Sequence, residues 1–187
     1  FEPRNIAIHG IHPEDVANKK RFIELWPAFN TFIGGLPVVA HNASFDISVL
    51  RATLTASNHL WPQLEYACTY VASKNLFDIA RHRLPDVARA ANVEWDEDQH
   101  HDALFDSRIC AEIVLALSNK QNSSTLMELL TSLNLEIGEL FEDGWYTCRS
   151  KSYSTKSHHS SGEKAHSPRD IPINAEADPS HPLFGQV

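Results

Sequence analysis

The fold is decided by residues 100–117, which read HHDALFDSRICAEIVLAL. From Asp106 onward the apolar residues recur at helical spacing, so this part is predicted to be a helix. Asp106 shares a helix face with the apolar positions Ile109, Cys110, Ile113 and Leu117. A carboxylate on such a face loses hydration, which is costly unless a cation or hydrogen-bond donors compensate. A metal ion is one such cation, whereas the helix dipole and a nearby arginine would also explain a single acid.

A second stretch repeats this arrangement. Residues 36–40 form a short apolar run that is typical of a buried strand. Residues 41–46, which read HNASFD, then begin a helix that Asn42 or Ser44 can cap. Asp46 lies in the first turn of this helix, again on the core-facing side. We expect the two acids to converge, because paired carboxylates hold the hard cations that hydrolyse phosphodiesters.

Both stretches resemble motifs of a known family. Residues 40–46 are similar to the second motif of the DEDDh, or DnaQ-like, 3′–5′ exonucleases of the DNA polymerase III epsilon type. His101, followed five residues later by Asp106, resembles the third motif. Residues 6–11 are similar to the segment that follows the third strand of the family. The resemblance covers roughly residues 5–117 and implies an α/β, RNase H-like exonuclease domain.

The resemblance implies a role for each matching residue. Asp46 and Asp106 would be metal-site carboxylates for two divalent ions, Mg²⁺ or Mn²⁺, and His101 the general base that activates the attacking water. The substrate would be the 3′ end of single-stranded DNA, with a DNA polymerase or repair proteins as partners. Three further positions match substrate-binding residues of the family, which hold the terminal nucleotide: His9, Asn42 and Phe45.

One departure from the family is large. Its first motif is an Asp-x-Glu pair on the opening strand, and no equivalent strand precedes Ile6 in the present sequence. Two-metal hydrolysis needs enough negative ligands to hold both cations about 4 Å apart. We therefore expect an incomplete domain that lacks its N-terminal strands, has little or no activity by itself, and aggregates through exposed strand edges.

The composition fits one domain and a tail, since 187 residues suffice for a single core. The formal charge of −8 argues against a protein that grips long nucleic acid, because phosphate contacts come from lysine and arginine. An enzyme that holds only a few terminal nucleotides needs no basic groove. Three cysteines without CxxC spacing, and no apolar run long enough to span a membrane, favour a cytoplasmic protein without membrane contact.

The chain is predicted to contain four parts. Residues 1–118 would form the partial exonuclease domain, and residues 119–148 a helical extension, because Thr125 and Glu128 have capping-box spacing. Residues 149–182 are rich in Ser, His, Lys and Pro and predict a flexible, disordered linker. Residues 183–187 resemble the beginning of a BRCT domain.

Other interpretations stay open at this stage. His100-His101-Asp102 contains the His-Asp pair of HD-type metal-dependent phosphohydrolases, although that class needs an all-helical setting and Val38-Val39 indicates a strand. The chain could instead be a non-catalytic interaction fragment in which the helix after Thr125 and the linker matter most. His100 also competes with His101 for the role of base, and the five-residue spacing to Asp106 selects His101.

Overall fold

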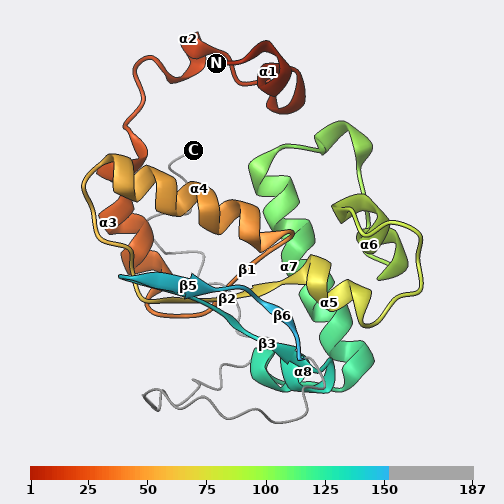
Figure 1. Cartoon of the computed structure of the whole chain (residues 1–187). Helices are drawn as coiled ribbons and strands as arrows, with labels where there is room; N and C mark the ends of the chain where they lie inside the picture. Colours follow the sequence, from red (N-terminus) through yellow and green to blue (C-terminus); the bar gives the residue numbers. More distant parts are fainter. Residues whose placement is uncertain (152–187) are drawn as a thin grey trace.

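The computed structural model describes residues 1–151 and shows a mixed α/β architecture (Figure 1). Four strands form the main sheet in the order β1-β2-β4-β5, and two short strands, β3 and β6, pair separately. β1 and β2 are parallel, whereas β4 runs antiparallel to both β2 and β5. The bounds of the strands are β1 Val38–Ala40, β2 Leu64–Cys68, β3 Leu135–Glu136, β4 Gly138–Phe141, β5 Gly144–Tyr146 and β6 Arg149–Ser150.

Eight α-helices and one short 3₁₀ helix, η1, lie among the described residues. The first two, α1 and α2, bury no side chain. The longest, α7, begins three residues after His100 and carries the apolar face that the sequence predicts. The bounds are α1 Pro3–His9, α2 Pro13–Val16, α3 Phe22–Ile33, α4 Ala43–Ala56, α5 Thr69–Lys74, α6 Leu84–Ala90, η1 Glu97–Gln99, α7 Ala103–Gln121 and α8 Leu126–Ser132.

Side chains of the parallel strands alternate between the two faces of the sheet. Val38 and Tyr66 pack into a cluster with residues of α3 and α4, whereas Val39 and Ala67 contact the cluster built around α7. The sheet therefore separates two layers of helices, with α3 and α4 on one side and α7 on the other (Figure 1).

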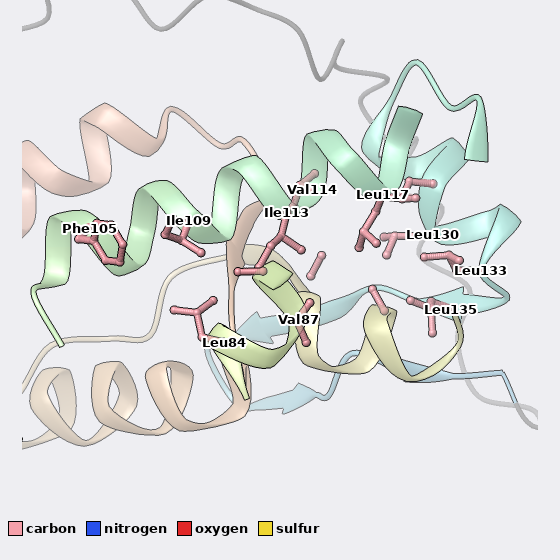
Figure 2. Close-up of a cluster of buried hydrophobic side chains, with 14 residues drawn as sticks. Leu84, Val87, Phe105, Ile109, Ile113, Val114, Leu117, Leu130, Leu133 and Leu135 are labelled. Carbon is pink, nitrogen blue, oxygen red and sulfur yellow. The ribbon is translucent and has the colours of Figure 1, made fainter. Parts of the chain in front are cut away.

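The larger apolar cluster is organised by α7. Figure 2 shows its side chains meeting residues of α6, α8 and β3. Leu84 and Val87 come from α6, and Leu130 comes from α8. This cluster fixes the axis of α7, and with it the position of the helix start that carries Asp106. The buried residues that α7 supplies are Phe105, Ile109, Ile113, Val114 and Leu117.

Residues 119–148 differ from the helical extension that the sequence predicts. Thr125 and Glu128 do form the predicted capping box, and α8 packs on the core. The helix ends at Ser132, however, and the apolar residues beyond it form strands, because Leu140 pairs opposite Leu64 in the main sheet. The sequence pattern was too short to show this pairing, since it depends on a strand some seventy residues away.

The first residues of the predicted linker form a strand. Arg149 and Ser150 form β6 opposite β3, and Arg149 donates from Nε to Glu136 at 2.7 Å. Residues 152–182 of the predicted linker and the segment compared with a BRCT domain, residues 183–187, lie outside the described residues. Among residues 1–151, none of the helices has the length and apolar character needed to cross a membrane.

Candidate active site

Asp46 is placed by a sharp strand-to-helix turn. β1 ends at Ala40 and α4 begins at Ala43, with Asn42 between them in the left-handed conformation at φ 65°. Asparagine tolerates this conformation better than most residues. Asn42 occupies the N-cap position, as predicted, but its side chain makes no capping hydrogen bond. The turn brings Asp46 into the first turn of α4, where it lines the same pocket as Ala40 at the end of β1.

Asp106 is placed by the start of α7. Asp102 caps this helix, since its Oδ1 accepts the backbone N–H of Phe105 at 2.8 Å. His101 precedes the cap with φ 74°, so the chain reverses there and turns both histidines back toward the helix. The use of Asp102 as a cap, together with the parallel pair β1 and β2, counts against the HD-type interpretation.

A pocket of about 360 Å³ joins the two helix starts. Asp46 and Phe45 line it from α4, Asp106 lines it from α7, and His101 lies at the loop before α7. Two predicted residues are not among those that line this pocket. His9 lies in α1, where its Nδ1 accepts the N–H of Ile11, and Asn42 is exposed in the turn. The full lining is Val39, Ala40, His41, Phe45, Asp46, Leu84, His100, His101, Asp106, Ser107 and Cys110.

His100 approaches Asp106 more closely than sequence spacing suggests. His100 Nδ1 lies 3.6 Å from Asp106 Oδ1, which is too long for a hydrogen bond. Both atoms are buried, and neither has a hydrogen-bond partner among the described residues. The His100 ring is held between the edge of Trp95, 5.0 Å away, and the stacked ring of His101, 3.7 Å away. The sequence identified the two histidines as competitors but gave no sign of the contact with Trp95.

The carboxyl group of Asp46 has no cationic partner among the described residues, although a backbone hydrogen bond partly offsets its desolvation. The residue as a whole is exposed, yet neighbouring groups desolvate its carboxyl end and raise its pKa above the usual range. No ion pair within residues 1–151 involves Asp46, whereas every arginine that forms an ion pair there binds another acid. The alternative explanation of a paired arginine therefore fails for both acids within residues 1–151, because the ion-pair partner of Asp106 there is His100 and not an arginine.

The residues at the pocket fit a cation. An ionised carboxylate only accepts hydrogen bonds, so a buried carboxylate oxygen without a donor is satisfied by a positive charge. Asp106 Oδ1 is such an atom, and Asp46 lines the same pocket. Carboxylate oxygens are the ligands that Mg²⁺ and Mn²⁺ prefer.

Sequence reasoning missed a buried hydrogen-bond network that connects the elements of the site. His41 Nε2 lies 2.8 Å from the carbonyl oxygen of His82, which can only accept, so Nε2 carries the proton. In the neutral ring Nδ1 then accepts the hydroxyl of Thr69 at 2.9 Å. Thr69 Oγ1 also lies 3.6 Å from Cys110 Sγ, one helical turn after Asp106. The signal was available, since His41 belongs to the same motif as Asp46.

Burial shifts the pKa values of two groups of this network. It lowers the pKa of the His41 imidazole, an effect that the backbone carbonyl of His82 and the charge of Asp106 partly oppose. Burial raises the pKa of the Cys110 thiol to about 11, so the thiol stays neutral at physiological pH. Both groups therefore act as neutral hydrogen-bonding partners in a network that ties the turn after β1 to α5 and α7.

Comparison with known proteins gives consistent matches. Residues 1–114 match the RNase T family, described as Exonuclease. The DNA polymerase III subunit epsilon of Escherichia coli is 27% identical over 126 residues, which are 65% of this chain and 52% of that protein. The same subunit of Rickettsia prowazekii is 31% identical over 127 residues, 64% of this chain and 54% of that protein.

A third relative is a much longer protein. The DNA polymerase III PolC-type of Thermotoga maritima is 32% identical over 112 residues, which are 60% of this chain and 8% of that protein. The chain thus spans about half the length of the epsilon subunits that it matches.

Proposed function

Because the chain belongs to the exonuclease family, and within it to the DnaQ-like 3′–5′ exonucleases, we propose that it carries the site that removes nucleotides from the 3′ end of single-stranded DNA. The observation that supports this most strongly is the single pocket shared by Asp46, Asp106 and His101. Enzymes of this family depend on divalent metal ions. Relatives named as DNA polymerase III subunits make a replicative polymerase a reasonable partner.

The two carboxylates would hold the metal ions. Asp46 and Asp106 approach from different helices, so cations between them would relieve the desolvation of one and the missing partner of the other. When bound, two Mg²⁺ or Mn²⁺ ions supply positive charge to the attacking water and to the leaving oxygen of the phosphodiester. The free energy that the two unpaired acids cost the folded protein is then offset by the free energy of cation binding.

A histidine at the pocket mouth would accept the proton of the attacking water. His101 is exposed and lies on the loop before α7, where its ring can turn over the pocket. His100 is less exposed and lies closer to Asp106, so its ring is suited to supporting that carboxylate. General-base catalysis needs an imidazole that can approach the attacking water, and an exposed histidine on a loop has the freedom to do so.

Phe45 would contact the terminal nucleotide. Phe45 is 64% exposed, which is unusual for a phenylalanine in a well-packed domain. It directly precedes Asp46, and both residues line the pocket. An exposed aromatic ring beside the reacting phosphate can stack on a nucleobase without regard to sequence. Asn42, in the turn before it, lies near enough in sequence to contact the same nucleotide, whereas His9 would have to approach from α1.

The chain alone is proposed to have little activity. Within the described residues, Asp46 and Asp106 are the two carboxylates that line the pocket. Mg²⁺ sheds its waters reluctantly, and two ions held by two carboxylates would bind weakly. Further acidic ligands would therefore be needed for efficient hydrolysis.

Metal binding and hydrolysis can be tested separately. Mn²⁺ should bind the purified chain with an affinity that falls at least tenfold in Asp106→Ala and is unchanged in Asp143→Ala, an exposed acid in the turn after β4. A 3′-labelled single-stranded oligonucleotide should lose little label. Rapid metal-dependent digestion abolished by Asp106→Ala would contradict the proposed low activity, and equal Mn²⁺ binding by both variants would contradict the site.

A further inference from the structure

The loop before α7 gathers nitrogen ligands beside a carboxylate. His100, His101 and Asp106 each offer one ligand atom, and these atoms all lie within 4.8 Å of one another. His100 Nδ1 and Asp106 Oδ1 are 3.6 Å apart, and both are buried without a partner among the described residues. This donor set differs from one made only of carboxylates, because two of its three ligands are imidazoles.

Imidazole nitrogen changes which cation is preferred. Mg²⁺ favours oxygen ligands, whereas Zn²⁺ and Co²⁺ bind imidazole well and exceed Mn²⁺ in affinity for mixed nitrogen and oxygen sites. Tetrahedral Zn²⁺ with bonds of about 2.0–2.1 Å holds neighbouring ligand atoms about 3.4 Å apart. The gap between His100 and Asp106 already has this length, to within a few tenths of an ångström.

We propose that His100, His101 and Asp106 form a zinc-binding site in which water is the fourth ligand. His100 and Asp106 already lie at nearly the separation that two zinc ligands need. The Trp95 ring, whose centroid is 5.0 Å from that of His100, limits the rotation of the imidazole. His101 is exposed, so its ring can leave its stack on His100 and close the remaining gap, from at most 4.8 Å to about 3.4 Å between ligand atoms.

Zinc at this site would switch off hydrolysis. A coordinated imidazole has no free lone pair for a proton, so His101 could not act as a base, and Asp106 would be withdrawn from the site for Mg²⁺ or Mn²⁺. This consequence rests on the proposed exonuclease function, whereas zinc binding itself does not. Zn²⁺ would then act as an inhibitor that competes with the activating metals.

Zinc binding is measured on the full chain by competition with a chromophoric chelator. His158, His159, His166 and His181 lie outside the described residues and are first replaced by glutamine, so that they cannot contribute. In this background, His100→Gln, His101→Gln and Asp106→Asn should each weaken Zn²⁺ binding at least tenfold. His59→Gln, which removes an exposed histidine elsewhere, should leave the affinity unchanged.

A second measurement needs no change to the site. Co²⁺ bound to the same background protein should give the intense visible absorption of a tetrahedral complex with nitrogen ligands. A weak octahedral spectrum, or equal Zn²⁺ affinity in all variants, would overturn the zinc site without affecting the proposed exonuclease function. Loss of Mn²⁺ binding only in Asp46→Asn and Asp106→Asn, with Zn²⁺ binding intact in Asp46→Asn, would show that the two sites share Asp106 and differ in their other ligands.

Discussion

At the scale of single residues, Asp46 opposes the stability of the fold. Desolvation raises its pKa in the folded state, so between the unfolded and folded pKa values the folded protein binds more protons. Stability therefore falls as pH rises through that window, and the ionised carboxylate is destabilising at neutral pH. Asp46→Asn should raise the melting temperature at pH 7 and lose stabilisation by Mn²⁺, which at a hundred times Kd is about 2.7 kcal/mol.

Thermal melts with and without Mn²⁺ check this prediction. Asp143→Asn is the matched control, since it removes an exposed acid from a turn and should change neither quantity. The gain from Asp46→Asn should shrink at acidic pH, where the native carboxyl group is protonated as well. A lower melting temperature for Asp46→Asn at pH 7 would mean that the carboxylate has a stabilising partner after all.

At the scale of elements, β4 depends on one small residue. Gly138 lies opposite Tyr66 in the sheet, and a Cβ added there would come 2.5 Å from the tyrosine ring and 2.7 Å from the backbone nitrogen of Cys148. Gly138→Ala should cost about 1–3 kcal/mol, because overpacking forces the buried ring to shift. In urea unfolding, adding Tyr66→Leu should recover part of this loss, and strictly additive costs would contradict the clash.

The network around His41 makes the packing of the turn after β1 against α5 and α7 sensitive to pH. Burial lowers the folded-state pKa of His41 below its usual value of 6.5. Unfolded chains therefore bind more protons below that value, and stability is complete above it and lost as pH falls. The charge of Asp106 and the hydrogen bond to the His82 carbonyl raise the pKa of the ring, whereas the side chain of His82 lowers it.

His41→Gln should therefore flatten the fall in melting temperature between pH 7.5 and 5.5. Thr69→Val should cost about 1 kcal/mol at pH 7.5, since it removes the hydroxyl that donates to His41. His59→Gln, at an exposed position, should keep the native pH dependence. If His59→Gln flattened the pH dependence of the melting temperature equally, the effect would not be specific to His41. The slope from Asp46 has the opposite sign, so it cannot produce this acid loss.

The sequence predicted elements well where the signal is local. Thr125 caps α8, and Asp106 lies in the first turn of a helix with a buried face. The sequence-based prediction failed where secondary structure depends on pairing between distant segments. An example is β4, whose partner strand β2 is far away in the chain. For the site, motif spacing named Asp46, Asp106 and His101. The contacts of His41 and His100 could not be read from spacing, because they join residues from different elements.

At the scale of the whole molecule, one edge of the described sheet is open. β1 is an end strand in the order β1-β2-β4-β5, and an apolar groove of about 340 Å³ runs beside it between α3 and α4. Phe29 and Val49 line this groove and are 41% and 48% exposed. An unpaired edge next to exposed apolar side chains promotes association between chains.

The purified chain should therefore associate as its concentration rises. Val49→Lys should reduce the association, measured by light scattering and sedimentation velocity, because a charge in the groove opposes its burial. Val49 is exposed on α4, so the fold should tolerate lysine. Leu115→Lys is the matched control, since Leu115 is an exposed apolar residue of α7 outside the groove. Equal association of both variants would place the contact elsewhere, and a concentration-independent monomer would show that the open edge is protected by other means.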